Sequence, residues 1–96
     1  MIEAKVAVKA AFEFMNSFLA GYTDILLEEI ELSDDDKFWN ITLSAIPPPP
    51  PLPDKLIDQS VLAAAFQRPK DSRIYKSFSV NSFTGSVKSM KIRVLA

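Results

Sequence analysis

The chain has 96 residues, 48% of them hydrophobic and 24% charged, which is the composition of a single ordinary globular domain. Its 11 basic and 12 acidic side chains nearly cancel, so there is no electrostatic footprint for nucleic acid or for an anionic membrane surface. Histidine and cysteine are both absent, which removes disulfides, thiol nucleophiles, most zinc sites and the usual general base of nucleophilic triads, and predicts a protein that is not an enzyme and has no cofactor.

The first predicted element is an amphipathic helix from about Glu3 to Ala20. Apolar residues recur there at steps of three and four, the spacing that places side chains on one face of a helix. Gly21 follows directly and is typical of a residue that ends a helix in the left-handed conformation. The apolar face consists of Ala4, Val8, Ala11, Phe12, Met15, Phe18 and Leu19.

Two strands joined by a turn are predicted next. Residues 24–33 and 37–46 alternate imperfectly between apolar and polar side chains, and the acidic run 34–36 between them indicates a hairpin turn. Successive side chains of a strand point to opposite faces, so one face of the second strand is polar and holds Asn40, Thr42 and Ser44. The other face is expected to meet the helix and holds Trp39, Ile41, Leu43 and Ala45.

A proline-rich insertion at residues 47–72 follows the second strand. The prolines at 47–51 have no backbone N–H, so they cannot continue a central strand and are expected to form polyproline II. Asp54 can then cap a short helix that ends near Gln67. The apolar residues of this short helix are Leu56, Ile57, Val61, Leu62, Ala65 and Phe66.

Part of the insertion has the pattern of a docking motif. Pro50 and Pro53 are three residues apart and Lys55 follows them, which is the spacing that domains with aromatic grooves read on a polyproline II ligand. The alternative is a stiff connection that carries the chain from the second strand to the short helix.

The second half of the chain predicts another hairpin. Residues 73–81 and 86–95 alternate and flank the turn 82–85, in which Gly85 suits a positive φ. Side chains expected to face the helix are Ile74, Phe78, Val80, Met90, Ile92 and Val94, and those expected outside are Tyr75, Val87 and Lys91. The sequence thus predicts one α+β domain over residues 1–96, with one N-terminal helix packed on a four-stranded antiparallel sheet.

The second hairpin resembles a known type of module. Residues 75–81 followed by Thr84-Gly85-Ser86-Val87 are similar to the end of PepSY-type modules, where a strand, an acidic residue, Thr-Gly and a further strand occur in that order. Asn81 stands where the acid is usual. The order of one helix and two hairpins resembles the cystatin-like arrangement, in which a curved sheet wraps one helix, although the Gln-x-Val-x-Gly hairpin of protease-inhibiting cystatins is missing. The chain also looks like small uncharacterised bacterial α+β proteins.

The strand pattern leaves several large apolar side chains on the face of the sheet opposite the helix. A contiguous apolar patch of that kind usually marks an interaction surface, and symmetric homodimers are its commonest use. We therefore predict a non-catalytic interaction or regulatory module that forms a homodimer, or binds another protein, through this face. The alternative is that the short helix of the insertion folds back over it. The predicted interface residues are Ile25, Leu27, Phe38, Tyr75 and Val87.

A second hypothesis is a carrier of small apolar ligands. Its cavity would lie between the helix and the sheet. The residues expected to line that cavity are Phe12, Met15, Trp39, Phe78 and Met90.

The remaining sequence features point to no further site. The acidic residues of the first hairpin match no known calcium loop, so no metal ligands are predicted. No apolar run approaches the ~18 residues of a membrane span, and the first residues lack a signal-peptide pattern. These features favour a cytoplasmic protein without nucleic-acid or membrane partners.

Overall fold

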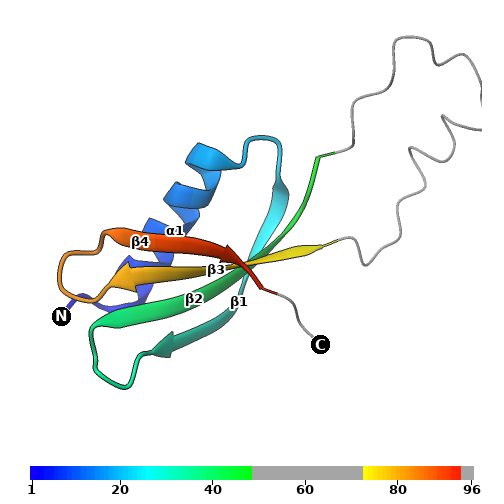
Figure 1. Ribbon diagram of the computed structural model, residues 1–96. Helices are drawn as coiled ribbons and strands as arrows, with labels where there is room; N and C mark the ends of the chain where they lie inside the picture. Colours follow the sequence, from blue (N-terminus) through cyan, green and yellow to red (C-terminus); the bar gives the residue numbers. More distant parts are fainter. Residues whose placement is uncertain (49–72, 94–96) are drawn as a thin grey trace, which may run out of the picture.

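The computed structural model describes residues 1–48 and 73–93 (Figure 1). One helix precedes four strands, and the strands form one antiparallel sheet in the order β1-β2-β3-β4. This is the predicted α+β arrangement. The predicted docking residues Pro50, Pro53 and Lys55, and the predicted short helix with them, lie outside the described residues. The elements are α1 (Ala4–Phe18), β1 (Thr23–Leu32), β2 (Phe38–Ile46), β3 (Ile74–Asn81) and β4 (Val87–Ile92).

Helix α1 buries a narrow stripe of small and flexible side chains. Ala7, Ala11 and Met15 are fully buried, and their spacing of four residues places them one above another on the face that meets the sheet. The helix ends slightly before the predicted Ala20. Gly21 then adopts φ 86°, and a Cβ at this position would lie 3.2 Å from Cβ of Pro48, so both the backbone angle and the close approach favour glycine.

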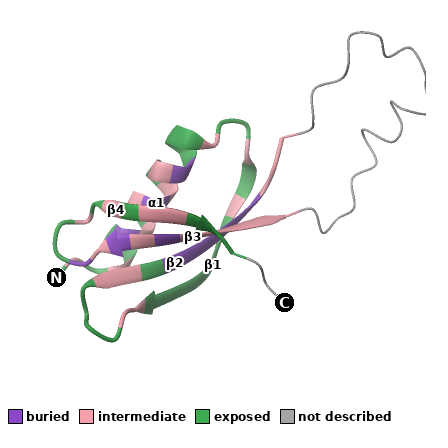
Figure 2. Ribbon diagram, viewed as in Figure 1, coloured by how far each residue is buried: buried purple, intermediate pink, exposed green. Residues whose placement is uncertain are grey.

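The hydrophobic core lies between α1 and the inner face of the two central strands. The predicted inward residues Ile41, Leu43 and Ala45 of β2 are completely buried, as are Phe78 and Val80 of β3. Figure 2 shows these buried stretches along the middle of the sheet, with β1 largely exposed. A helix about 10 Å wide covers only about two strands spaced ~4.8 Å apart. It therefore covers the central strands best, and the helix-side faces of β1 and β4 extend beyond it.

The register of the sheet shows which side chains share a face. Cross-strand partners point to the same side, and one row across the four strands is Ile30, Ile41, Phe78 and Met90, which faces the helix. The next row is Glu29, Thr42, Ser77 and Lys91, which faces away from it.

Bulges in both edge strands overturn part of the predicted facing: β1 has register shifts between Thr23 and Leu26 and between Leu27 and Glu29, and β4 has one at Lys88. Leu27 pairs with the buried Leu43, and Glu28 is then an extra residue before the next pair, so Leu27 lies on the helix side and not on the outer face. Lys88 is likewise extra between the pairs of β4, and Val87 therefore faces the helix. Ile25 also packs against the core. Strict alternation along each strand predicts the opposite side for all three of these apolar residues, because one extra residue reverses every facing beyond it.

The hairpin between β3 and β4 is built by local hydrogen bonds. Oδ1 of Asn81 accepts the backbone N–H groups of Phe83 and Thr84, at 2.8 and 2.9 Å, and Gly85 has the predicted positive φ of 77°. The neutral Asn81 oxygen thus does what one carboxylate oxygen of an aspartate does in such a turn. Among the described residues there is no helix with the length and apolarity needed to cross a membrane.

Candidate functional site

The structure does not bring the five predicted interface residues together. Phe38 and Tyr75 lie on the outer face of the sheet, where each is half-buried. Ile25 and Val87 lie on the opposite face and pack against the hydrophobic core. Leu27 is on the helix side too, but it is exposed at the edge of the sheet. The expected outer facing is therefore wrong for three of the five residues, Ile25, Leu27 and Val87.

The outer face is instead mainly polar. Nζ of Lys88 lies 4.7 Å from the centre of the Phe38 ring, so a cation covers one of the aromatic side chains on the outer face. Leu26, which the alternation does not assign to this face, is an outer-face residue because it pairs with Ser44. The polar side chains of the central rows are Asn40, Thr42, Ser44, Ser77, Ser79, Asn81 and Ser89.

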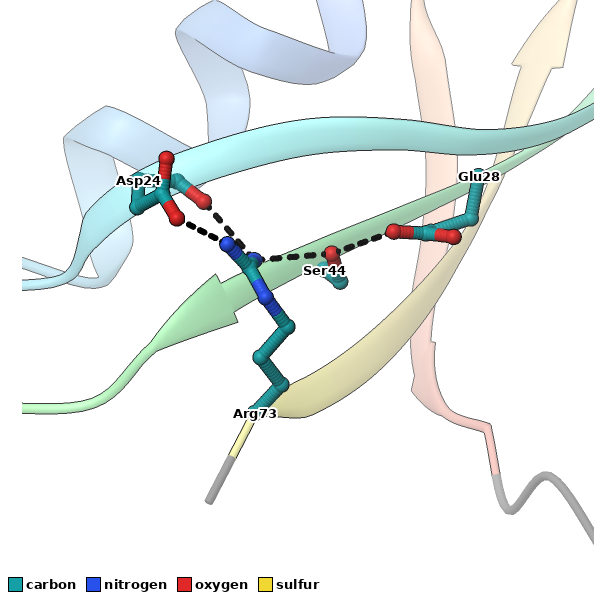
Figure 3. Close-up of polar contacts among 4 residues, drawn as sticks. All are labelled: Asp24, Glu28, Ser44 and Arg73. Carbon is teal, nitrogen blue, oxygen red and sulfur yellow. Dashed lines mark hydrogen bonds and ion pairs between the residues drawn. The ribbon is translucent and has the colours of Figure 1, made fainter. Parts of the chain in front are cut away.

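One polar cluster links three parts of the chain where β2 ends and β3 begins (Figure 3). We call Asp24, Glu28, Ser44 and Arg73 the polar cluster. Ser44 donates its hydroxyl hydrogen to Glu28 Oε1 at 2.8 Å and accepts a hydrogen bond from Arg73 Nη1 at 3.0 Å. Arg73 also donates to the backbone carbonyl of Asp24 and forms an ion pair with its carboxylate. Residues 49 positions apart in the sequence thus meet on the outer face.

The polar cluster has the features of a structural link between strands. Asp24 has φ 52°, a left-handed conformation that aspartate tolerates better than most residues, and Arg73 holds it from both its carbonyl and its side chain. Ser44 is completely buried, and both its donor and an acceptor lone pair are used within the cluster. A serine nucleophile needs access to a substrate and a base, and this hydroxyl has no such access.

A second arginine crosses the outer face. The backbone N–H of Arg93 donates to the carbonyl of Tyr75 on β3, and its Nη2 lies 3.2 Å from Glu29 Oε1 on β1. The side chain therefore passes over the two central strands, where Thr42 is almost fully buried. Both side chains of this ion pair are nearly half exposed, so its contribution to stability is small.

An exposed apolar surface lies along the edge strand β1, away from the centre of the outer face. All residues from Leu26 to Glu31 of β1 are exposed, and we call them the β1 edge surface. Leu26 and Leu27 are each 45% exposed and Ile30 is 38% exposed. Among the strands that the structure describes, β1 pairs with β2 alone, so its second backbone edge has no strand beside it.

The β1 edge surface combines apolar and acidic side chains. Leu27 and Ile30 project on the helix side, because their cross-strand partners Leu43 and Ile41 do so, but α1 does not extend far enough to cover them. Glu29 and Glu31 project on the outer side. Sequence reasoning missed this surface, although the pair Glu28 and Glu29 inside an alternating strand is a signal for a bulge.

The acidic turn between β1 and β2 is also organised by its own hydrogen bonds. The Ser33 hydroxyl donates to Asp35 Oδ1 at 2.6 Å, and the backbone N–H of Lys37 donates to the same oxygen at 3.1 Å. The Ser33 hydrogen bond, followed by that of Lys37, lowers the pKa of Asp35. Within residues 1–48 and 73–93, no group of three or more carboxylates is arranged to hold a metal ion.

The side chains predicted to line a ligand cavity all belong to the core packing. Met15 and Phe78 are completely buried, and Phe12, Trp39 and Met90 pack against them and their neighbours. Their placement between helix and sheet is as predicted. The contacts that they make are those of α1 packed on the sheet.

Comparisons with known proteins give no relative for this chain. No family model, no curated protein and no solved structure matches it. The resemblance to PepSY-type and cystatin-like domains therefore stays a prediction.

Proposed function

We propose that this chain is a non-catalytic protein-interaction module that binds an extended partner strand along the β1 edge surface. The observation that carries this proposal is the row of six consecutive exposed residues on an edge strand, in which Leu26, Leu27 and Ile30 are large and apolar. An edge strand of this kind has backbone donors and acceptors that a partner strand can pair with, in addition to side chains that give specificity.

The chemistry of the β1 edge surface indicates what kind of strand would fit. A partner paired with β1 would place alternate side chains beside Leu27 and Ile30 on the helix side, so these should be apolar. Its remaining side chains would lie beside Glu29 and Glu31, so these should be basic. The expected partner is therefore a strand that alternates between apolar and basic residues.

The proposed function is the interaction module that the sequence predicts, but the binding surface is the edge strand β1 and not the outer face of the sheet. The outer face has a polar centre, a cation over Phe38 and the polar cluster around the buried Ser44, and it lacks the contiguous apolar patch that the strand pattern predicts there. The β1 edge surface has the exposed apolar side chains instead.

Selection of displayed peptides tests this function without a known partner. A random library of peptides, each long enough for a strand of about six residues, is selected on the wild-type protein. The same library is then counter-selected on the Leu27→Lys, Ile30→Lys double variant. Val6→Lys is the matched control, because Val6 is an exposed apolar residue on α1 with 46% exposure.

The result expected is enrichment of peptides that alternate apolar and basic residues, bind the Val6→Lys control normally and lose binding to the double variant. Enriched peptides that bind the double variant as well as the wild type would contradict the proposed surface, as would a selection with no enrichment.

A further inference from the structure

The two edge strands of the sheet carry opposite charges. Strand β1 contains four acidic residues and no basic one, whereas β4 contains two lysines, is followed by Arg93 and has no acidic residue. On the helix side both strands are apolar. Ile92, at the end of β4, is 75% exposed, so this edge also has an apolar side chain that α1 does not cover.

These charges decide which edges can meet. Two copies joined through their β1 edges would place acidic residues beside acidic residues, and two joined through their β4 edges would place lysines beside lysines. Like charges directly opposite each other in a sheet are unfavourable, and opposite charges are favourable. The β1 edge of one copy is therefore complementary to the β4 edge of another.

We propose that the β1 edge surface binds strand β4 of a second copy of this chain, so that one sheet continues from molecule to molecule. This inference rests on the proposed function, because it names the partner of the same edge. Strand β4 alternates between apolar residues on the helix side and mainly polar or basic residues on the outer side, which is the pattern that β1 requires.

The direction of the strands permits this contact. The four strands alternate in direction, so β1 and β4 run opposite to each other. A second copy that is moved sideways across the sheet, without being turned over, brings its β4 antiparallel to β1. Both helices then lie on the same face of the continued sheet.

The register of this contact follows from the rows of the sheet. Glu29 lies in one row with Lys91, so a sideways move without a shift along the strands places Lys91 of one copy directly beside Glu29 of the next. The adjacent row places Met90 beside Ile30 in the same way. The contact thus joins a charge contact on the outer side, where Lys91 would share Glu29 with Arg93 of the same chain as Glu29, to an apolar pair on the helix side.

The backbone hydrogen bonds of the sheet also fit across the junction. Along one row of an antiparallel sheet, hydrogen-bonded and non-hydrogen-bonded pairs alternate from one strand to the next. Within one copy, a row contains three cross-strand pairs, and the first and third are of the same type. The fourth pair, between β4 of one copy and β1 of the next, therefore has to be of the other type, and this is the type that the unpaired sides of both edge residues offer. The fit is uninterrupted where residues 29–31 lie beside residues 89–91, because the extra residues Glu28 and Lys88 lie just beyond the two ends of this stretch.

The contact joins two different edges, so each bound copy still presents one unoccupied β1 and one unoccupied β4. Such a head-to-tail contact extends the assembly further with every copy, unless the twist of the sheet closes it into a ring. The short bulge-free stretches predict a weak contact. We therefore expect an average mass that rises steadily with protein concentration.

Two blocked variants test this arrangement by sedimentation velocity. The β1-blocked variant is Leu27→Lys, Ile30→Lys. The β4-blocked variant is Lys91→Glu, Ile92→Lys, which places Lys beside Lys in the row of Leu27 and Glu beside Glu29, so the two blocked edges also repel each other in the mixture. All four side chains are exposed in the wild type, so the fold should be kept. Wild type, each variant alone and an equal mixture are compared from about 10 μM to about 1 mM, the range in which weak contacts are measured. Far-ultraviolet circular dichroism checks the fold of each variant, and Val6→Lys is the control.

The expected result has three parts. The wild type and the Val6→Lys control increase in mass with concentration, each blocked variant alone stays a monomer, and the mixture forms a dimer and nothing larger. This pattern occurs only when the β4 edge of one copy binds the β1 edge of another. Reversing both charges in one chain, by Glu29→Lys with Lys91→Glu, should restore the association that each single reversal weakens about fivefold.

Other results overturn the inference in distinguishable ways. A β4-blocked variant that associates like the wild type would show a contact of β1 with β1, which removes the second copy's β4 as partner but leaves the proposed function intact. A wild type and a mixture that stay monomeric at every concentration would remove the second copy altogether. The proposed function would then be decided by the peptide selection alone.

Discussion

Strands β1 and β2 lie side by side and have similar apolar content, but several apolar side chains of β2 are completely buried and several of those of β1 are exposed. Leu43 of β2 is completely buried, whereas its cross-strand partner Leu27 is 45% exposed. Ile41 and Ile30 differ in the same way. The difference arises from the place of each strand under a helix that covers about two strands, and not from hydropathy. Identical residue types therefore stabilise the fold at one position and are available for binding at the next.

The largest expected effect is that of a leucine in the central strand. Leu43→Ala should lower the free energy of unfolding by about 3 kcal/mol, because it removes a completely buried side chain and leaves a cavity in the core. Leu27→Ala should cost about 1 kcal/mol or less, since its side chain is largely in water. Urea unfolding of both variants measures the comparison. Equal losses would mean that the helix covers β1 as well as β2.

The two arginines of the outer face give a second comparison. Arg73→Met should lower the free energy of unfolding by about 2 kcal/mol, because the Arg73 side chain is only 19% exposed and its loss leaves the buried Ser44 without one of its partners. Arg93→Met should cost less than about 1 kcal/mol, as expected for a half-exposed ion pair. Thermal unfolding of the two variants at low and high salt ranks them. An Arg93 effect as large as that of Arg73 would contradict the ranking.

Two substitutions of Asn81, in the turn between β3 and β4, distinguish the effect of losing hydrogen bonds from the effect of adding a charge. Asn81→Ala should cost about 1 kcal/mol, because two backbone N–H groups lose the oxygen that accepts from them. Asn81→Asp should keep nearly all the stability, since a carboxylate oxygen can accept the same two hydrogen bonds. Chemical denaturation of both variants decides this, and an aspartate variant as unstable as the alanine variant would show that the turn rejects a negative charge.

The smallest expected effect concerns the acidic turn between β1 and β2. Because the pKa of Asp35 is lowered in the folded chain, its ionised form stabilises the fold above the pKa of an unfolded aspartate, and this contribution is lost as the pH falls through the lowered value. Ser33→Ala removes the main cause and should raise the pKa of Asp35. Carboxyl-carbon NMR titration of Asp35 in the wild type and in the variant measures the shift. An unchanged Asp35 titration would show that the Ser33 hydrogen bond does not control it.

Local patterns predicted most of the fold. The four-residue spacing of Ala11 and Met15, or the position of Gly85 in a turn, depends on neighbours within a few residues and is visible in the sequence, whereas the burial of Ala7 and the 67% exposure of Phe18 depend on how the helix lies on the sheet. The α+β class and the inward face of β2 follow from such patterns.

The candidate site depended on features that local patterns do not contain. One extra residue at Glu28 and another at Lys88 reversed the facing of Leu27 and Val87, and neither bulge can be placed by counting alternate residues. The contact of Arg73 with Asp24 joins residues 49 positions apart and needs the sheet to exist first. The exposure of β1 depends on the width of a helix that packs mainly on the two central strands.

The N-terminal segment is tied to the sheet by the sole tryptophan of the chain. The indole N–H of Trp39 donates to the carbonyl of Ile2 at 3.3 Å, and the N–H of Ile2 donates to Ser82 at 2.6 Å. Trp39 is half-buried against the core, so its fluorescence depends on whether the segment before α1 is docked. The protein therefore contains its own optical probe: a red shift of the emission that precedes the loss of sheet circular dichroism would report undocking of the first residues as a separate step of unfolding.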